Sequence, residues 1–448
     1  MVSYDVIVIG AGLLGCFTAR NLKRYDLSVA LIERNADVCL EISKANTAVV
    51  YAGYDNKPCS MKAEFTVRGN NNFNRLCNEL DVQFNRCGSL MTVYAEAGVE
   101  VLKKKLNYGI QNGVKGLEII NPNRIKNIES SISDSVISAL YCPSTGTVNP
   151  WELCIAAYEN AIQNGVNAYF NTNVLSYNHG IIKTDKGDFK TRFVIDCSGI
   201  NSGKLVNSRY KIETDGADYI VLDKSCSGKP KTIIFEQSGE KCKGITAVPT
   251  IEGSLLVGPT HRPSKSFKAT DSEGLNELTD SLKRLLPELE HKVIRNFAAD
   301  RPNVQTDDGE DIHDFAIESR DDYFSFIGVK TPGLTCADEL GKYAANICAK
   351  KLYARENVSF NSTRKNITRV HNLDYAERTE LIKNNPEYGI IICRCADISK
   401  AEIREAVKRG AKDVEGVKHR VGTSMGFCQG SRCEEAIKKI LEEENAPV

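Results

Sequence analysis

The chain has 448 residues, a length that predicts two or three folding units. Hydrophobic residues make up 42% of the chain and charged residues 26%, a composition that excludes disorder as its main state. The 58 basic and 58 acidic side chains cancel, so no overall field attracts nucleic acid or anionic lipid. We therefore expect no nucleic-acid partner.

The start of the chain carries no targeting signal. Met1 to Asp5 lead directly into a strand pattern, and no run of about 18 apolar residues follows anywhere in the sequence. We expect no integral membrane segment and a cytoplasmic location, with any attachment to a membrane made through a partner. The sixteen cysteines are too sparse for a disulfide scaffold, and most, such as Cys154, Cys197 and Cys348, stand singly among apolar residues. These are predicted to be buried thiols.

The first strand, helix and second strand predict a nucleotide-binding βαβ unit. Residues 5–9 form a short apolar run, Gly10-Ala-Gly12-Leu-Leu-Gly15 follows at once, and residues 28–32 form a second strand that ends at Glu33. Gly10 permits the tight turn, Gly12 lets backbone amides approach a pyrophosphate, and Gly15 lets helix and strand pack closely. Glu33 is placed to accept hydrogen bonds from ribose hydroxyls. The pattern does not separate NAD from FAD, and its alternative is a structural glycine turn.

Two later segments favour FAD. Residues 193–199 are a buried strand ending in Ser198 and Gly199, similar to the turn that closes over the adenosine of FAD in two-dinucleotide-binding flavoproteins. Residues 324–329 form another strand, followed by a glycine turn at Gly333 and a predicted helix at 337–352. Such a turn presents N–H groups to an anion, here the N1–C2=O edge of a flavin, which becomes negative on reduction.

Seven segments together resemble the FAD family of the D-amino-acid-oxidase type. Within it they are most similar to the branch of glycerol-3-phosphate dehydrogenase and L-2-hydroxyglutarate oxidase, and the resemblance covers about the first 350 residues. The segments are Gly10–Gly15, Ser43–Asn46, Thr145–Pro150, Asp196–Gly199, Gly253–Thr260, Arg301-Pro302 and Lys330–Thr335.

The resemblance implies a fold class and a division into domains. We expect an α/β FAD-binding domain, Rossmann-like and of the two-dinucleotide-binding type, over residues 1–80, 146–212 and 296–352. An interleaved α+β substrate domain, built on a separate antiparallel sheet, is expected over 81–145 and 213–295. Strands at 218–222 and 254–257 would lie in that sheet, with an amphipathic helix at 275–285 over it. The expected FAD contacts are Gly10, Gly12, Leu13, Leu14, Gly15, Glu33, Arg34, Ser43, Asn46, Ser198, Gly199, Gly333, Leu334 and Thr335.

Four residues are expected at the catalytic centre, the first of them, Arg301, because the family places the arginine of its Arg-Pro segment near the flavin. Arg301 would hold a small anionic substrate, because a guanidinium grips phosphate or carboxylate with two bonds. Lys330 would stabilise the reduced flavin, Tyr51 would line its substrate face, and His261 would approach the substrate. The alternatives are a structural arginine, an exposed lysine, core packing and a polar surface histidine.

Two departures from the family leave the substrate open. Family members often carry a histidine where this chain has Tyr51, and many have glutamate where it has Asp218. A histidine base or a histidyl–flavin bond therefore cannot be carried over to position 51. The catalytic base is not identified.

The carboxy-terminal part carries a cysteine motif. Residues 353–387 are polar and are predicted to form a connecting arm, the alternative being a surface helix pair packed on the flavin domain. After them come Cys393-x-Cys395 and Cys428-x4-Cys433, four thiols that can bind a metal centre. Capping boxes at Ser399 and Ser431 predict helices from about residues 400 and 432, with Cys433 in a first turn that favours thiolate. Glycines at 426 and 430 allow amides to point at sulfur.

The motif resembles the bacterioferritin-associated-ferredoxin-like [2Fe–2S] domain, which implies a small helical domain over 388–446. Zinc is the alternative, since four cysteines also bind it readily. FAD accepts two electrons and a [2Fe–2S] cluster passes them singly, so the combination predicts a dehydrogenase rather than an oxidase.

The expected reaction is the oxidation of a small anionic hydroxy substrate, with glycerol 3-phosphate favoured, and the transfer of electrons to a flavoprotein or iron–sulfur partner subunit. The alternatives are a dehydrogenase of L-2-hydroxyglutarate or another 2-hydroxy or amino acid, an electron-relay subunit of a larger complex, and a zinc-bound docking module.

Overall fold

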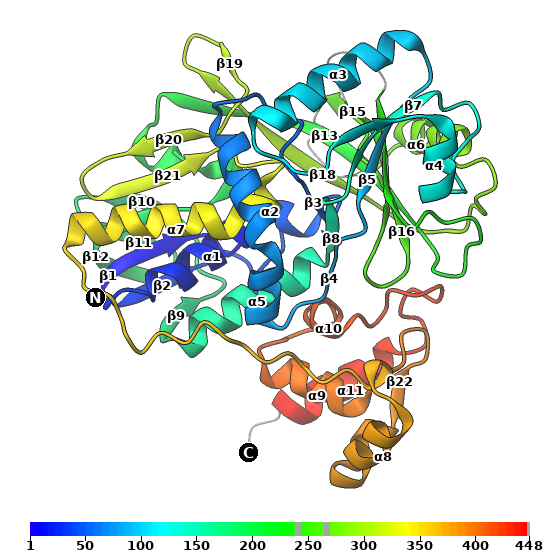
Figure 1. Ribbon diagram of the computed structural model, residues 1–448. Helices are drawn as coiled ribbons and strands as arrows, with labels where there is room; N and C mark the ends of the chain where they lie inside the picture. Colours follow the sequence, from blue (N-terminus) through cyan, green and yellow to red (C-terminus); the bar gives the residue numbers. More distant parts are fainter. Residues whose placement is uncertain (238–242, 264–268, 446–448) are drawn as a thin grey trace.

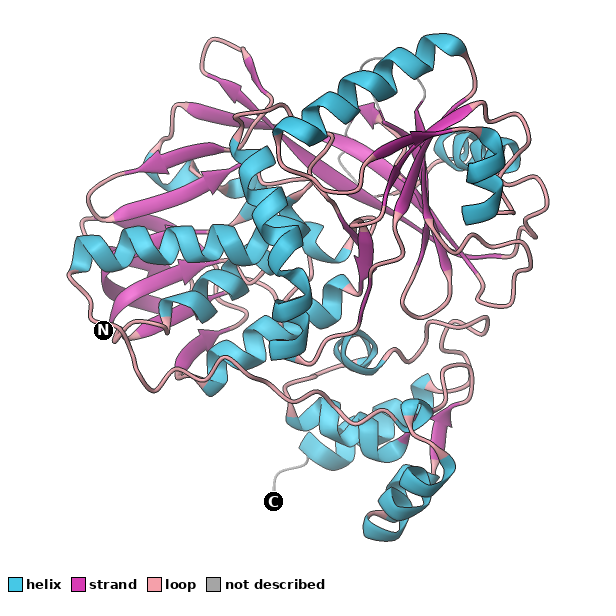
Figure 2. Cartoon of the chain, in the orientation of Figure 1, coloured by secondary structure: helices cyan, strands magenta, loops and turns pink. Residues whose placement is uncertain are grey.

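The computed structural model describes residues 1–237, 243–263 and 269–445 (Figure 1). The chain folds into two large parts, each built on one large sheet, and a small, mainly helical part follows at the carboxy terminus (Figure 2). Ala446, the last residue expected in the carboxy-terminal domain, lies outside the described range. None of the helices within that range is both long enough and apolar enough to cross a membrane.

The first sheet has eight strands and a parallel centre. The five parallel strands lie in the order β9-β2-β1-β12-β21. They are β1 (Val2–Ile9), β2 (Val29–Ile32), β9 (Val166–Tyr169), β12 (Gly187–Asp196) and β21 (Tyr323–Ile327). The antiparallel additions are β10 (Val174–Asn178), β11 (Ile181–Thr184) and β20 (Ala316–Ser319). Because Ile9 pairs with Asp196, and Asp196 with Ser325, the carboxyl ends of three strands from distant parts of the sequence meet at one edge. Ligands bind at this edge in open parallel sheets.

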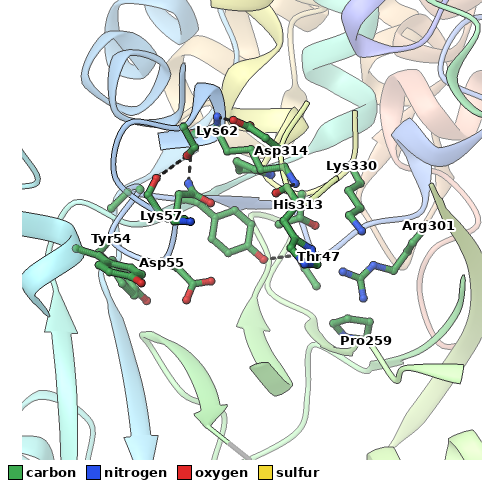
Figure 3. A pocket seen from close by; sticks show the side chains of 18 of the residues that line it. Thr47, Tyr54, Asp55, Lys57, Lys62, Pro259, Arg301, His313, Asp314 and Lys330 are labelled. Atoms are coloured by element: carbon green, nitrogen blue, oxygen red, sulfur yellow. Dashed lines mark hydrogen bonds between the residues drawn. The ribbon is translucent and has the colours of Figure 1, made fainter. Parts of the chain in front are cut away.

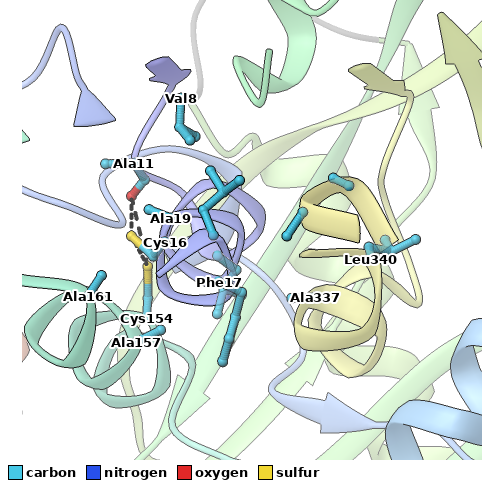
Figure 4. Close-up of a cluster of buried hydrophobic side chains, with 14 of the residues drawn as sticks. Val8, Ala11, Cys16, Phe17, Ala19, Cys154, Ala157, Ala161, Ala337 and Leu340 are labelled. Carbon is cyan, nitrogen blue, oxygen red and sulfur yellow. Dashed lines mark hydrogen bonds between the residues drawn. The ribbon is translucent and has the colours of Figure 1, made fainter. Parts of the chain in front are cut away.

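Four helices accompany this sheet. They are α1 (Leu13–Leu22), α2 (Met61–Leu80), α5 (Pro150–Gln163) and α7 (Gly333–Leu352). Phe17 of α1 is fully buried in one core with Ala157 of α5 and with Ala337 and Leu340 of α7 (Figure 4). A Cβ atom on Gly341 would stand 2.8 Å from the backbone of Phe17, so α1 and α7 approach at a glycine.

The thiols in this region are mostly buried, as predicted. Cys154 and Cys348 are fully buried and Cys197 is half-buried, and every cysteine in the described ranges is free. The Cys154 thiol lies 3.8 Å from the sulfur of Cys16, in the core drawn in Figure 4.

The second sheet has ten strands and confirms the strands expected at 218–222 and 254–257. It runs β19-β18-β13-β16-β15-β14-β5-β7-β6, with β17 also paired to β13. Its strands are β5 (Ser89–Val93), β6 (Glu118–Ile120), β7 (Ser138–Cys142), β13 (Tyr210–Leu222), β14 (Ile233–Gln237), β15 (Lys243–Pro249), β16 (Leu255–Gly258), β17 (Arg262–Pro263), β18 (Val293–Thr306) and β19 (Asp311–Ile312). All pairs are antiparallel except β5 with β14. Because β18 pairs along the whole of β13, the sheet continues to Ile312, beyond the boundary expected at residue 295.

Helices and short strands complete this part. The expected amphipathic helix is α6 (Ser272–Leu285), whose Leu278, Leu282 and Leu285 are fully buried with residues of β13 and β16. The other helices are α3 (Glu96–Gln111) and α4 (Pro122–Ile128). A small sheet of β3 (Val49–Val50), β8 (Gly146–Val148) and β4 (Phe84–Asn85) lies between the two large sheets (Figure 1).

The arm after α7 is extended at first. Arg364 fixes it to the first part through Glu159, with Nε 2.6 Å from a carboxylate oxygen, and through the carbonyl of Leu80. Only its end is helical, in η4 (Val370–Asn372) and α8 (Tyr375–Asn384). The arm is therefore an extended segment that lies against the first part, and the described residues do not form the helix pair considered as an alternative.

The carboxy-terminal part is small and mainly helical, as expected. Its elements are η5 (Pro386–Gly389), β22 (Ile391–Cys393), β23 (Ile398–Ser399), α9 (Lys400–Lys408), α10 (Val414–Val421) and α11 (Glu434–Asn445). Ser399 and Glu402 form the predicted capping box at the start of α9. The capping box predicted at Ser431 is wrong in position, because the helix expected from about residue 432 is α11, which begins at Glu434. The carbonyl of Cys433 accepts a hydrogen bond from the amide of Ile437, so Cys433 is the residue that precedes the helix.

Candidate functional site

A cavity of about 660 Å³ opens at the carboxyl edge of the first sheet, where the glycine turn lies. Gly10 has φ +93°, and a Cβ atom there would stand 2.7 Å from the carbonyl oxygen of Cys197. A Cβ atom on Gly15 would stand 1.8 Å from the carbonyl oxygen of Gly10. Neither position can hold a side chain. At Gly10 both the positive φ and the clash exclude it, and at Gly15 the clash alone does.

Alanine at position 15 tests this close packing. Because the clash is between a side chain and backbone, we expect Gly15→Ala to lower the free energy of unfolding by about 3 kcal/mol and to weaken FAD binding. Denaturant unfolding and FAD titration measure the two effects. The control is Gly389→Ala, whose Cβ atom would make only an ordinary 3.4 Å contact. Equal stability of the two variants would contradict the assignment.

Further groups at this edge fit a dinucleotide. The amide of Leu13 donates to Ser43 Oγ at 3.0 Å, and Leu14 also lines the cavity. The hydroxyl of Ser198 is buried and has no hydrogen-bond partner among the described residues, although the residue lines the cavity with Gly199. An unpaired buried hydroxyl is costly unless a ligand satisfies it. The residues present therefore fit bound FAD.

The acid and the base that follow β2 lie at the same cavity. Glu33 accepts hydrogen bonds from the amides of Ala11, at 2.7 Å, and Asn35, at 2.8 Å. Each carboxylate oxygen keeps a second lone pair for a ribose hydroxyl. Arg34 lines the cavity and forms an ion pair with Glu41 at 2.9 Å.

The segments before α2 and at α7 place the other expected contacts. Asn46 lines the cavity and shapes its turn, since its side chain donates to the carbonyl of Ser43 at 2.8 Å. Gly333 and Leu334 line it from the first turn of α7, and the amide of Gly333 donates to the carbonyl of Lys330. Thr335 does not line it: this side chain is buried and accepts a hydrogen bond from the amide of Tyr51 at 2.9 Å. The structure thus places Thr335 behind the site, where it supports Tyr51.

A second cavity, of about 850 Å³, adjoins the first (Figure 3). The two share part of their walls, and the isoalloxazine end of FAD is expected at this junction. The shared residues are Asn46, Thr47, Tyr51, Tyr219, Arg301, Lys330, Thr331 and Pro332. Thus three of the four residues expected at the catalytic centre lie at the junction, and His261 lines the second cavity.

Arg301 and His261 are in direct contact. One guanidinium nitrogen of Arg301, Nη1, lies 2.7 Å from Nδ1 of His261. Since a guanidinium only donates, the contact requires His261 to accept at Nδ1 and to be neutral. Arg301 lies on β18 opposite Asp215 of β13, which fixes its backbone in the sheet.

Lys330 stands among other positive charges. Burial, and then the nearby Arg301 and Lys62, lower the pKa of Lys330 to about 8. Its amino group donates to the side-chain carbonyl of Asn303. Lys62 is buried too, and burial is the main cause that lowers its pKa. Asp215 and Asp311 act to raise the pKa of Lys330, and Asp314 that of Lys62, so carboxylates already offset part of this positive charge. An anionic ligand would stabilise the charged lysines further.

Sequence reasoning missed Lys62. It lies in the first turn of α2 and lines the second cavity, where its amino group donates to the carbonyl of His313 at 2.8 Å (Figure 3). The carboxylate of Asp314 caps the same turn by accepting from the amides of Met61 and Lys62. No local motif marks Lys62, and its partners follow about 250 positions later in the chain.

Aromatic residues form the rest of the junction. The ring of Tyr51 stacks on Phe235 with centroids 5.9 Å apart, and its hydroxyl lies 3.4 Å from Thr47 Oγ1. Tyr219 is stacked on Phe297 at 4.7 Å, and burial raises the pKa of its hydroxyl. The two stacked rings form aromatic walls at the junction.

The four motif cysteines come together as two pairs. The sulfur atoms of Cys395 and Cys428 lie 3.5 Å apart, and those of Cys393 and Cys433 also interact. Cys393 and Cys433 are buried, whereas the other two are partly exposed. Within the described ranges, no three His, Cys, Asp or Glu side chains are placed to hold one metal ion. Two pairs suit a cluster of two irons, each with two thiolates, better than a single tetrahedral zinc.

Backbone amides around these thiols favour negative sulfur. Burial alone would raise the pKa of Cys428, but the amide of Gly430 and the neighbouring Cys395 and Arg432 bring it below the usual value. Burial raises the pKa of Cys393, and amides of Ser424 and Ala396 oppose the shift. Of the two glycines around Cys428, Gly430 makes the expected N–H···S contact, and the amide of Arg432 adds another. The residues fit a [2Fe–2S] cluster.

Comparison with known proteins agrees with this geometry. Residues 5–347 match the family described as FAD dependent oxidoreductase, of the D-amino-acid-oxidase type. The chain belongs to this family. Residues 391–443, which contain all four motif cysteines, match the BFD-like [2Fe-2S] binding domain. The protein is therefore an FAD-dependent oxidoreductase with FAD and [2Fe–2S] as cofactors, and the iron–sulfur interpretation is favoured over zinc.

Relatives extend the comparison. A protein of Caloramator mitchellensis named glycerol 3-phosphate dehydrogenase is 37% identical over 98% of this chain and 94% of its own. A glycerol 3-phosphate oxidase of Mycoplasma genitalium is 26% identical over 80% of this chain and 97% of its own. Among solved structures, the FAD-bound L-alpha-glycerophosphate oxidase of Mycoplasma pneumoniae has a TM-score of 0.73 at 23% identity, covering 81% of this chain and 99% of its own. That likeness shows the fold.

Proposed function

We propose that this enzyme oxidises glycerol 3-phosphate to dihydroxyacetone phosphate and sends the electrons through its [2Fe–2S] cluster to a partner protein. The observation that carries the substrate is the convergence of Arg301, Lys330 and Lys62 on one cavity. A phosphate monoester dianion would pair with these three cations. The Caloramator relative, which spans nearly the whole chain, supports the same substrate.

The residues of the cavity have distinct roles in this proposal. Arg301 would grip the phosphate in a bidentate fashion, with His261 holding the guanidinium from the side. Lys62 would add a second charge–charge contact from the wall opposite the sheet. Bound FAD would supply the acceptor for the hydride. Lys330, at the junction of both cavities, would stabilise negative charge on the reduced ring.

Electron transfer to a partner is supported by the exposed residues that adjoin the motif cysteines in the sequence. The carbonyl of Cys395 itself accepts a hydrogen bond from Lys224 of the second large part. Cys395 and Cys428 are its accessible ligand candidates, and the side chain of Phe427 beside them is 81% exposed. Arg394 and Arg432, each adjacent to a motif cysteine, are exposed as well. An exposed aromatic ring and two exposed positive charges suit docking of an acidic flavoprotein or iron–sulfur partner.

The substrate proposal is tested by anaerobic reduction of the flavin. Glycerol 3-phosphate should bleach the flavin absorbance of the full-length, cluster-loaded protein, with L-2-hydroxyglutarate and glycerol as comparison substrates. Bleaching by L-2-hydroxyglutarate alone would establish the alternative dehydrogenase. If no 2-hydroxy acid and no polyol phosphate bleaches it, the chain acts as a relay in a larger complex.

Lys330 should make the flavin potential depend on pH. Lysine is charged below its pKa and neutral above it, so the positive charge beside the flavin is lost as pH rises through about 8. We expect the midpoint potential of the flavin to fall more steeply with pH near pH 8 than at lower pH. The Lys330→Met variant should lack this steeper fall. The Lys330→Arg variant should keep the positive charge, so its midpoint potential should also show no steeper fall near pH 8. An identical steeper fall in the methionine variant would contradict the role.

A further inference from the structure

The carboxy-terminal domain is joined to the FAD-binding part by a buried ion pair. Arg420 of α10 holds the carboxylate of Asp37 with two hydrogen bonds, from Nη1 at 2.5 Å and from Nη2 at 2.9 Å. The Arg420 side chain is 1% exposed and that of Asp37 12%. A buried, bidentate pair of this kind fixes both position and orientation, and losing either partner leaves a buried charge uncompensated.

A second contact lies beside the first. The imidazole of His419, also on α10, packs against the indole of Trp151 with ring centroids 4.6 Å apart. Trp151 stands in the first turn of α5, and its indole N–H donates to the carbonyl of Lys44 at 3.2 Å. Figure 1 shows α10 next to α5, on the side of the carboxy-terminal domain that faces the first sheet.

Both contacts involve the segment of residues 37–44, which forms one wall of the FAD cavity. Asp37 lies in the irregular segment after β2, and Lys44 ends the short helix η1 (Ile42–Lys44) that follows it. Between them, Glu41, Ile42 and Ser43 line the cavity. The same stretch reaches the glycine turn, because the amide of Cys39 donates to the carbonyl of Ala11 at 3.0 Å.

We propose that Arg420 is a positioning residue for FAD: through Asp37, and with His419 on Trp151, the docked cluster domain holds the 37–44 wall of the dinucleotide cavity in its FAD-binding form. A stretch with little regular structure has low local stability and needs such support from outside. The coupling is reciprocal, so FAD in the cavity stabilises the docking of α10. This inference depends on FAD binding and not on which substrate is oxidised.

The test measures FAD release from the full-length, cluster-loaded holoenzyme by the rise of flavin fluorescence after dilution. Arg420→Met should release FAD at least about tenfold faster than the unmodified protein. The matched control is Arg409→Gln, which removes another contact across the same interface, 3.2 Å from Glu159, that does not touch the wall. Release from this control should stay within about twofold, since Glu159 keeps its pair with Arg364.

Two further measurements keep the outcome decisive. Asp37→Asn preserves shape while removing the charge, and replaces Arg420→Met if that variant fails to fold. Trp151 is the chain's single tryptophan, so a red shift of its emission reports that α10 has left. Hydrogen exchange of residues 414–421 should be slower with FAD than in the deflavo protein. Unchanged FAD release in both variants, equal acceleration in Arg409→Gln, or FAD-independent exchange would each overturn the proposal.

Discussion

Replacing Cys428 with serine is expected to leave the flavin reducible by substrate while turnover with a one-electron protein acceptor falls by about a hundredfold. The reason is that the two cofactors serve different steps. Hydride transfer needs only the FAD domain, whereas single-electron transfer needs the cluster. Cys428 is the motif cysteine whose pKa is lowered by surrounding amides, so serine there removes a thiolate that the fold stabilises. Anaerobic stopped-flow reduction and steady-state turnover with a ferredoxin measure these two effects, and iron and sulfide content shows whether the cluster is retained.

The control for this variant is Cys87→Ser. Cys87 is partly buried like Cys428, and it is not among the residues that line either cavity. It should retain iron, sulfide and full turnover. The interpretation fails if Cys428→Ser keeps wild-type turnover with the protein acceptor, because electrons would then leave without the cluster.

Replacing Arg301 with methionine is expected to lower kcat/KM for the reducing substrate by about a hundredfold, which corresponds to about 2.7 kcal/mol of transition-state stabilisation. Arg301 contributes a fork of donors that no neighbouring lysine can reproduce, and His261 is already oriented against it. Most of the effect should appear in KM, because the guanidinium binds the substrate anion before and during hydride transfer. Steady-state kinetics under anaerobic conditions separate the two constants.

Arg301→Lys is the matched variant for charge. It keeps the positive charge and loses the bidentate geometry, so its kcat/KM should lie between those of the methionine variant and the unmodified enzyme. An unchanged KM in Arg301→Met would show that the substrate anion is held elsewhere in the cavity, with Lys62 the next candidate.

The features that sequence reasoning recovered have local signals. The Gly10–Gly15 turn, the strand before it and Glu33 lie within one βαβ unit, and their spacing reflects contacts that the structure contains. The motif cysteines were recognisable because C-x-C and C-x4-C each bring two thiols to one loop. The capping box at Ser399 is likewise a matter of four consecutive residues.

The features that it missed depend on distant residues. Lys62 reaches the second cavity only because the segment around His313 lies against the start of α2 in the folded chain. Thr335 was expected at the flavin and instead supports Tyr51, a contact across 284 positions. The length of the substrate sheet was underestimated because β18 has few buried positions and no regular alternation of apolar and polar residues, and owes its place to pairing with β13. Tertiary pairing overrides such local preferences.

The pairing of β1 with β12, and of β12 with β21, has a consequence for biosynthesis. Strand β1 can pair with β2 once residue 32 has emerged, but its other neighbour, β12, begins only at residue 187, and the sheet gains β21 only after residue 323. The cavity walls span positions 9 to 334, so the flavin can be captured only when three quarters of the polypeptide has emerged. Nascent chains therefore expose an unpaired, apolar edge for much of translation and should depend on chaperones until the cofactor arrives.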